Sequence, residues 1–363
     1  MEGDILEVIK YWLEGEITNF IKVWLITYTS ITYCYFASKI IPKGKSRLLA
    51  FLPIISLFIY LPFTLHSTHL GGTTTFFITW LTNFKLLMFT YNVGPLADPS
   101  ITTLFHFVAI ACLPIKIIEK NNPIDDSIQK GKKSTLHYAI KVLFMAMFLK
   151  VYDYTNLIHP RIIMFIYSIH TYLLLEIILV ICASLARGLL NVEVEPQFQE
   201  PFLSTSLQDF WGRRWNLMVT RILKPSVYIP VLKSSERFLG RSYSQLLAIF
   251  ATFAVSAAMH ELIFYQMGRL KPNWGITLFF LMHGVCLVLE VGAKKVLGVK
   301  IQFPGILGRV FTVAFVMGTG FWLFFPQLVR VKAFERGLGE YAAIGAFFKD
   351  IAKALNLSTF QTQ

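Results

Sequence analysis

The chain has 363 residues, of which 55% are hydrophobic and 15% aromatic, while only 15% are charged. A soluble domain carries about 25% charged residues, so this composition leaves too few polar side chains to cover a surface that faces water. The mean hydropathy of +0.57 agrees with that deficit. Disorder, collagen-like repeats and a disulfide scaffold are excluded, because the counts of 22 Gly, 15 Pro and 4 Cys are unremarkable for this length. We therefore expect an integral membrane protein.

Positive charge is in excess, since 34 Lys and Arg against 21 Asp and Glu give a net charge of +13. In a membrane protein such an excess usually lies in cytoplasmic loops, where it sets the orientation and meets anionic headgroups. Nucleic acid is a poor alternative partner, because no basic helix or RNA-binding signature stands apart from the apolar runs. The cysteines form no CxxC or Cys/His cluster, so we expect no metal site and interpret them as packing residues: Cys34, Cys112, Cys182 and Cys286.

The chain begins with an acidic segment of about 18 residues, and no small-residue cleavage site follows the first apolar run, so we expect an anchor there and no removable signal. A helix that crosses the bilayer core needs about 20 apolar residues. By that measure the candidate spans lie at about 20–41, 48–66, 73–91, 101–118, 137–151, 160–186, 243–265, 274–293 and 305–328. The expected fold is an all-α polytopic bundle of about eight or nine hydrophobic helices that forms one domain, residues 1–363.

The distribution of Lys and Arg bears on orientation. Lys43, Lys45 and Arg47 place the first connection in the cytoplasm. If the first four runs all crossed the bilayer, a lysine cluster would lie on the opposite side: Lys120, Lys130, Lys132 and Lys133. The conflict disappears if the 101–118 run, which contains Pro114 and Lys116, is a partial element, and we predict this. The alternative is that a loop on the far side tolerates the four lysines.

The longest polar interval, 187–242, is predicted to be a basic cytosolic loop with interfacial helices. It contains the run FWGRRWN at 210–216, in which Trp211 and Trp215 are four residues apart with two arginines between them. On a helix this spacing puts both tryptophans on one face, which suits the headgroup boundary, with the cations turned to water. The simple alternative to a functional motif is therefore an interfacial anchor.

Several ionisable residues lie inside apolar runs, where burying a charge is costly and suggests a function. They are His170, Glu176, His260, Glu261, His283 and Glu290, with His66 and His69 at the end of the second run. His260 stands out because Ser256 lies one helical turn before it and Glu261 follows it directly. A structural histidine remains the alternative.

Other chemistries are excluded by their missing residues. The sequence after His260 lacks the second histidine of HExxH, which excludes that zinc-protease motif. Neither Gly44-Lys45 nor Gly131-Lys132 completes a P-loop, so no nucleotide-binding loop of that type is predicted. The absence of a GxSxG run excludes the usual nucleophile of an α/β-hydrolase.

These runs together resemble a known family. FWGRRWN at 210–216, followed about 44 residues after Asn216 by His260 within SAAMHE at 256–261, resembles the paired signature of the membrane-bound O-acyltransferases. The segments WLTNFKLL (80–87), GPL (94–96) and LPIKI (113–117) are similar to the plant wax synthase branch. In this order the motifs are specific for the superfamily. They do not fix the acceptor, because the branch includes wax ester synthases, sterol acyltransferases and diacylglycerol acetyltransferases.

The resemblance implies an internal chamber in which an acyl-CoA thioester from the cytosol meets a lipid alcohol from the bilayer. His260 would be the general base and Asn216 a hydrogen-bond donor to the developing oxyanion. Trp211, Arg213, Arg214 and Trp215 would bind acyl-CoA, although solvated loop charges are an equal interpretation of the arginines. Ser256, Glu261 and His283 would support the site. No cofactor is expected, since acyl-CoA or acetyl-CoA is a substrate, and transfer is expected to be direct.

The most favoured hypothesis is an acyl-CoA-dependent O-acyltransferase that makes a wax ester from a long-chain fatty alcohol, in the endoplasmic reticulum membrane with the 187–242 segment facing the cytosol. Its alternatives within the enzyme class are a diacylglycerol acetyltransferase, which would use acetyl-CoA, and a sterol O-acyltransferase. A transporter would predict inverted repeats, and no such self-similarity is found in the sequence. A non-catalytic lipid-binding protein would tolerate the loss of His260.

Overall fold

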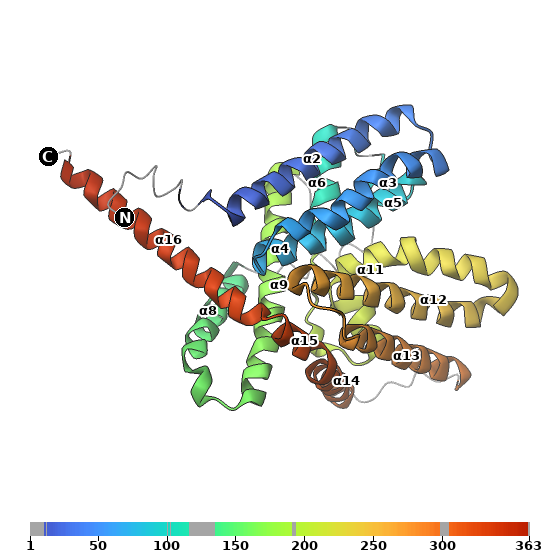
Figure 1. The fold of residues 1–363 in the computed structure, drawn as a ribbon. Coiled ribbons are helices and arrows are strands. Elements are labelled where there is room, and N and C mark those ends of the chain that lie inside the picture. Colours follow the sequence, from blue (N-terminus) through green and yellow to red (C-terminus); the bar gives the residue numbers. More distant parts are fainter. Residues whose placement is uncertain are drawn as a thin grey trace.

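The computed structural model describes residue 11 and residues 13–99, 101, 103–115, 135–190, 194–297 and 305–361. The lysine cluster of residues 120–133 lies outside these ranges, so the orientation that it suggests stays a prediction. Within them the helices and helical turns follow one another along the chain, which confirms the all-α class. Figure 1 shows them gathered in a bundle from which α16 projects to one side.

The first part of the chain forms a group of helices around an apolar core. Its elements are α2 (Glu16–Ile40), α3 (Lys45–Tyr60), η1 (Leu61–Thr64), α4 (His69–Thr74), η2 (Thr75–Thr82), α5 (Asn83–Thr90), η3 (Pro95–Ala97) and α6 (Leu104–Cys112). The elements α4, η2 and α5 continue directly into one another, with a π-helical stretch in the middle. Phe51, Phe58 and Phe107 are buried at the centre of the core.

Within the 101–118 run, whose partial character stays a prediction, the described residues form only the short helix α6. It has 9 residues, whereas a straight span needs about 20. The chain leaves the helical conformation at Leu113, just before Pro114, where φ −89° and ψ 145° are typical of the residue preceding proline.

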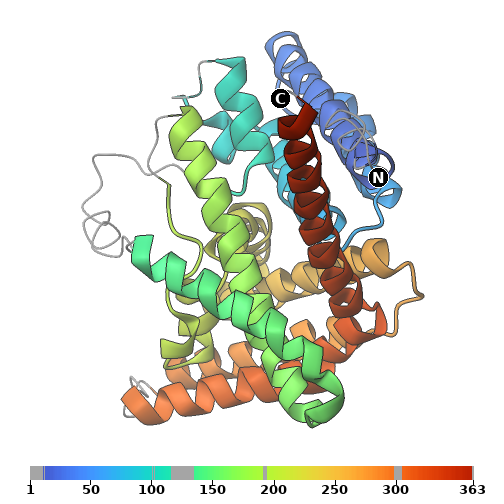
Figure 2. The same ribbon diagram turned by 90° about the vertical axis from the view of Figure 1, so that its left-hand side faces the viewer.

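Two longer helices follow, α8 (Thr135–Val151) and α9 (Pro160–Leu190), joined through η4 (Tyr152–Leu157). Figure 2 shows α8 lying obliquely across α9. Lys141 of α8 and Glu176 of α9 form an ion pair between largely buried side chains. Because each charge has a partner, the cost of burying it is offset, and the pair fixes the contact of the two helices.

The 187–242 interval, predicted as a loop with interfacial helices, is mostly helical from residue 201 onward. It holds η5 (Pro201–Leu203), α10 (Leu207–Asp209), η6 (Phe210–Arg214), α11 (Leu217–Leu223), η7 (Lys224–Tyr228) and the start of α12 (Ile229–Gly268). Gly240 interrupts α12 with a left-handed φ of 69°, and the chain reverses direction at this end of the bundle (Figure 1). Glycine suits this position because side chains with a Cβ rarely adopt a positive φ.

The last part of the chain packs on the second leg of α12. It comprises α13 (Gly275–Val296), α14 (Gly305–Thr319), η8 (Gly320–Phe324), α15 (Phe325–Arg330) and α16 (Ala333–Gln361). A side chain at Gly284 of α13 would meet Phe253 Cβ at 2.8 Å, so the absence of a Cβ there allows α12 and α13 to approach closely. Helix α16 was not predicted, because its sequence mixes small and charged residues with apolar ones and has no long apolar run.

Five of the described helical segments are long and apolar enough to cross a membrane: Lys45–Thr64, Pro160–Leu190, Leu217–Gly268, Gly275–Val296 and Gly305–Arg330. The predicted spans at 20–41, 73–91 and 137–151 form helices outside this group, because polar residues dilute them or, in α8, because the helix has only 17 residues. That these three segments cross the membrane therefore stays a prediction.

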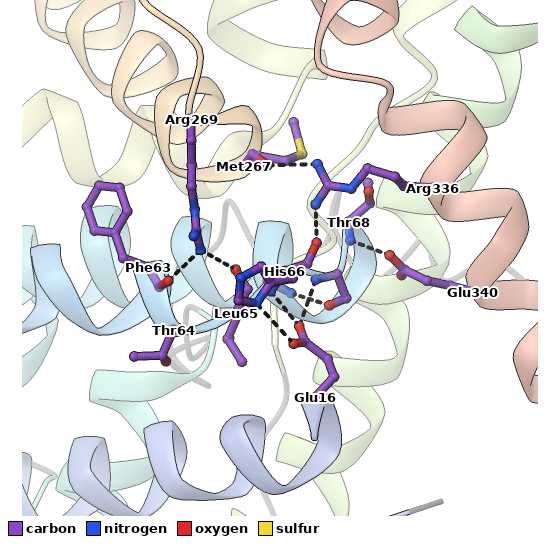
Figure 3. Close-up of polar contacts among 12 residues, drawn as sticks. Glu16, Phe63, Thr64, Leu65, His66, Thr68, Met267, Arg269, Arg336 and Glu340 are labelled. Carbon is purple, nitrogen blue, oxygen red and sulfur yellow. Dashed lines mark hydrogen bonds and ion pairs between the residues drawn. The ribbon is translucent and has the colours of Figure 1, made fainter. Parts of the chain in front are cut away.

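The segment 63–69 between α3 and α4 is held by side chains that come from three other parts of the chain (Figure 3). Glu16 of α2 accepts hydrogen bonds from the backbone N–H groups of His66 and Ser67 at 2.8 and 2.7 Å. Glu340 of α16 accepts from the backbone of Thr68 and His69. These two carboxylates provide hydrogen-bond acceptors for backbone N–H groups that have no acceptor within a helix.

Arginines bind the carbonyl side of the same segment. Arg269, at the end of α12, donates to the carbonyl oxygens of Phe63 at 2.5 Å and Leu65 at 3.2 Å. Arg336 of α16 donates to the carbonyl of His66 and, at 2.8 Å, to that of Met267 (Figure 3). The segment thus joins the N-terminal group of helices to α12 and α16.

Candidate active site

His260 lies in the second leg of α12, and its ring has a defined orientation. Nδ1 lies 2.8 Å from the backbone carbonyl oxygen of Ser256, one turn earlier, and 3.4 Å from the Ser256 hydroxyl. A carbonyl oxygen can only accept, so Nδ1 carries the proton and donates it. In the neutral imidazole Nε2 then holds a lone pair, and no hydrogen bond to Nε2 is found within the described residues. The tautomer is the one that a general base needs.

Aromatic rings enclose this imidazole. Phe280 of α13 stacks on it with the ring centroids 4.1 Å apart and an interplanar angle of 26°. Trp80 of η2 meets it edge-to-face, with the centroids 4.9 Å apart at 79°. Phe324 of η8 approaches at 6.4 Å. The imidazole of His260 therefore lies in an apolar surrounding to which three separate elements contribute.

The other ionisable residues that the sequence singled out are engaged elsewhere. Glu261 accepts from the backbone N–H and the hydroxyl of Thr277 at 3.2 and 2.9 Å, in the first turn of α13, and so supports the start of that helix. Glu290 accepts from the Leu207 N–H at 2.9 Å and pairs with Lys294 at 2.5 Å. His170 meets the Tyr152 hydroxyl at 3.0 Å. With Glu176 paired to Lys141, these contacts account for their burial without catalysis.

The FWGRRWN run forms a π-helical turn, Phe210–Arg214, after which Trp215 is extended. Trp211 lies against Phe253, Phe280 and His283, while Trp215 stacks on Phe210 with the centroids 5.4 Å apart. The two indoles are 6.5 Å apart. These contacts direct both rings into the protein, which argues against the alternative of an interfacial anchor.

The two arginines of the run have different surroundings. Arg214 pairs with Asp209 at 2.8 Å and donates to the carbonyl of Gln199 at 3.1 Å, so it ties the turn to the preceding chain. Arg213 is exposed, and within the described ranges no ion pair with a carboxylate is found for it. Of the two, Arg213 is therefore the cation that a phosphate group could reach.

Asn216 begins α11 in the left-handed region, with φ 38° and ψ 66°. Its side-chain oxygen is buried without a hydrogen-bond partner in the described part of the chain. Asparagine tolerates this backbone conformation better than most residues. No hydrogen bond joins Asn216 to His260 among the described residues; the two are linked indirectly, through Trp215, Trp211 and Phe280.

Comparison with known proteins identifies the group to which this arrangement belongs. A sequence model of the membrane bound O-acyl transferase family matches residues 194–282. The chain is 45% identical to acyl-CoA–sterol O-acyltransferase 1 of Arabidopsis thaliana, over 94% of this chain and 99% of that protein. It is 40% identical to the long-chain-alcohol O-fatty-acyltransferase of Simmondsia chinensis, over 91% of this chain and 95% of that protein. The probable long-chain-alcohol O-fatty-acyltransferase 3 of Arabidopsis thaliana is 41% identical to this chain, over 90% of this chain and 94% of that protein.

The chain belongs to the membrane-bound O-acyltransferase family. The matched segment contains the 210–216 run, Ser256 and His260, and it reaches Phe280. The resemblance noted on these motifs, including that to the wax synthase branch, is thereby confirmed.

A cavity of about 230 Å³ lies near the 210–216 run of this O-acyltransferase. Its walls are mainly apolar and come from η3, α6, α11 and η7, with Asp98 and Arg221 as the charged residues: Gly94, Pro95, Asp98, Ile101, Ile110, Ile115, Met218, Arg221, Ile222 and Pro225. Met218 lies two residues after Asn216 in α11. Gly94 and Pro95 of the GPL segment and Ile115 of the LPIKI segment, both of which resemble the wax synthase branch, thus line the cavity.

Phe280 and Phe324 could not be found by sequence reasoning, because single phenylalanines among 33 carry no positional signal. Trp80 was noted only as part of a family-like run, although it contacts His260 directly. The hydroxyl of Thr319 lies 2.9 Å from His283 Nε2, and nothing in the sequence pattern pointed to this contact either.

Proposed function

We propose that this protein is an acyl-CoA-dependent O-acyltransferase that esterifies a membrane-dissolved lipid alcohol, in the first place a long-chain fatty alcohol to give a wax ester. The observation that carries the proposal is the lone pair of His260 Nε2, fixed by the bond from Nδ1 to Ser256 and enclosed by aromatic rings. The relatives named as long-chain-alcohol O-fatty-acyltransferases support the same substrates.

In the proposed reaction Nε2 of His260 accepts the proton of the alcohol hydroxyl while that oxygen attacks the thioester carbonyl carbon. The C–O bond forms, and the carbonyl oxygen takes up the negative charge, which the Asn216 amide would stabilise as a donor. When the C–S bond breaks, the thiolate of coenzyme A leaves and takes the proton from the imidazolium. The products are the ester and free coenzyme A, and the base is restored. We keep direct transfer, without an acyl-enzyme, as part of the proposal.

For the donor, we propose that the apolar cavity beside α11 receives part of the acyl-CoA and that exposed Arg213 contacts its phosphates. Apolar walls suit a hydrocarbon chain, and an arginine outside them suits phosphate oxygens. Arg214 has a smaller part in this proposal than its neighbour, because Asp209 already neutralises it. The 187–242 segment would lie on the cytosolic face of the endoplasmic reticulum membrane, where it could meet acyl-CoA from the cytosol.

A sterol acceptor is the second candidate, because the relative that is 45% identical is named a sterol O-acyltransferase. Purified membranes should be given either a long-chain acyl-CoA or acetyl-CoA, each together with a fatty alcohol, a sterol, diacylglycerol or glycerol 3-phosphate. We expect wax ester as the main product. Steryl ester as the main product would favour the second candidate, and ester formed only from diacylglycerol with acetyl-CoA would favour an acetyltransferase. Preference for glycerol 3-phosphate would overturn the assignment to a lipid alcohol.

The catalytic role of His260 has its own test. His260→Ala should lower turnover about 100-fold or more, since general-base catalysis typically contributes that much. Glu261→Gln is the matched control, because Glu261 lies next in the chain but binds Thr277. Equal amounts of protein in the membrane must be compared. If His260→Ala kept more than about a tenth of the wild-type turnover, His260 would not be the base.

A further inference from the structure

His283 is fully buried in α13, and both nitrogens of its ring have partners. Nδ1 lies 3.1 Å from Trp211 Nε1, and Nε2 lies 2.9 Å from the hydroxyl of Thr319. Tryptophan can only donate, so Nδ1 accepts and Nε2 carries the proton. The Thr319 hydroxyl accepts a hydrogen bond from this N–H while it donates to the carbonyl of Phe315 at 2.7 Å. His283 is thus held as a neutral acceptor that faces the indole.

The indole that His283 holds is in contact with the ring beside the base. Trp211 and Phe280 have centroids 6.0 Å apart, and Phe280 stacks on His260 at 4.1 Å. The bond from Nδ1 to Ser256 anchors one edge of the imidazole. It does not by itself prevent the ring from tilting about that edge. The stacked Phe280 ring restricts the tilt and so fixes the direction in which the Nε2 lone pair points.

We infer that His283 is a positioning residue for the base, which acts through Trp211 and Phe280 on the orientation of His260. The inference rests on the proposed role of His260 as the base. Each step of this chain of contacts is a hydrogen bond or a ring contact between residues from the 210–216 turn, α12 and α13. Trp211 of the 210–216 run would thereby help to orient His260, the base that acts on the alcohol. Its neighbours in the run could at the same time contact acyl-CoA.

The geometry of the ring allows a test by two conservative substitutions. The side-chain oxygen of asparagine can take the place of Nδ1, whereas the side-chain nitrogen of glutamine can take the place of Nε2. His283→Asn therefore keeps an acceptor for Trp211, and His283→Gln keeps only the contact with Thr319. Trp211→Phe retains a ring but removes the N–H donor.

We expect Trp211→Phe and His283→Gln to lower kcat about tenfold, because a reacting group displaced by about 1 Å can cost up to about 100-fold. The KM values for acyl-CoA and for alcohol should change less than about twofold, because the Trp211 ring is turned towards Phe280 and His283 and away from the exposed Arg213. His283→Asn should retain kcat within about threefold of the wild type, which is the rescue that a purely space-filling role would not give. The double variant Trp211→Phe, His283→Gln should be no slower than either single variant, because both remove the same bond.

Thr319→Val is the matched control on the other side of the ring. It removes the partner of Nε2 and should lower the melting temperature more than it lowers kcat, because Trp211 alone still requires a lone pair on Nδ1. Equal kcat for His283→Asn and His283→Gln, or a change confined to KM, would overturn the inference. If His260→Ala were itself active, the proposed function would fail first; if His260 were essential while Trp211→Phe kept full kcat, only the positioning role would fail.

Discussion

The side chain of Lys85 donates to the backbone carbonyl of Leu113 across 2.6 Å, although the lysine is completely buried within the N-terminal group of helices. The same ammonium group lies 2.6 Å from the carbonyl of Ile110, and the hydroxyl of Thr82 donates to that of Ala111 at 3.0 Å. These carbonyls belong to the end of α6, where no further helical turn pairs them. A cation at this end also suits the helix dipole. The partial helix can therefore end inside the bundle.

The first prediction concerns Lys85→Met, which keeps the length of the side chain but removes its donors. Two buried carbonyls would lose their partner, and each such group costs about 1–3 kcal/mol. We expect a lower melting temperature and less protein in the membrane, both measured on detergent-solubilised samples. Lys39→Met is the control, because Lys39 is exposed on α2. Equal stability of the two variants would contradict the capping role.

The second prediction separates the backbone role of Asn216 from its chemistry. Asn216→Gly permits the left-handed conformation and removes only the amide. We expect the variant to accumulate normally but to lose about 100-fold or more in kcat, as when an oxyanion donor is removed. Asn216→Ala should lose stability as well, because alanine is strained at a positive φ. Full activity of the glycine variant would show that Asn216 serves the turn alone.

The third prediction distinguishes the neighbouring arginines. Arg213→Ala should raise KM for acyl-CoA severalfold with little change in the melting temperature, since its guanidinium is exposed. Arg214→Ala should instead lower the melting temperature, because it removes the cation that pairs with Asp209 and the donor to the Gln199 carbonyl. Steady-state kinetics at several salt concentrations, beside thermal melts, measure both effects. If Arg213→Ala left KM unchanged, Arg213 would be a solvated surface charge.

The fourth prediction concerns pH and the attachment of α16. Burial alone would raise the pKa of Glu340, but the hydrogen bonds from the ring and backbone of His69 and from the backbone of Thr68 outweigh it, so the pKa lies below its ordinary value of 4.5. A depressed carboxyl pKa adds stability that is present above the unfolded value and is lost as the pH falls through the folded one.

Glu340→Gln should therefore lower the melting temperature at neutral pH, and the difference from the wild type should shrink as the pH falls below 4.5. Protease cleavage within α16 reports the same loosening. Glu335→Gln, on the exposed side of the same helix, is the control. A difference that is independent of pH would mean that the charge of Glu340 does not hold the segment.

Composition and run length were sufficient to predict an all-helical membrane protein, because apolar length is a property that each segment carries alone. The importance of His260 also followed from the sequence, since an ionisable residue in an apolar run is costly wherever the chain folds. What the sequence could not supply were partners distant in the chain. Glu261 precedes Thr277 by 16 positions and Trp211 precedes His283 by 72, and nothing in the spacing identifies either contact.

The same reason limits the prediction for the 187–242 interval, a basic cytosolic loop with interfacial helices. Its charges were read as exposed, whereas Arg214 is neutralised by Asp209 and Arg221 by Glu195, so a basic segment folds into helices against the bundle. Helix α16 was missed because its anchoring depends on Glu340 and Arg336, whose partners lie about 270 residues earlier.

The segment 63–69 has a consequence for synthesis of the chain. Its backbone groups are made early, yet the side chains that satisfy them come from Glu16, from Arg269 and from Arg336 and Glu340. Because domains fold as the chain emerges, the segment must wait, hydrated or held by another factor, until nearly the last helix has left the ribosome. A chain that stops before α16 would keep His260 and lack the contacts that Arg336 and Glu340 make with this segment. Such a chain would present unpaired backbone donors by which quality control could distinguish it from the finished enzyme.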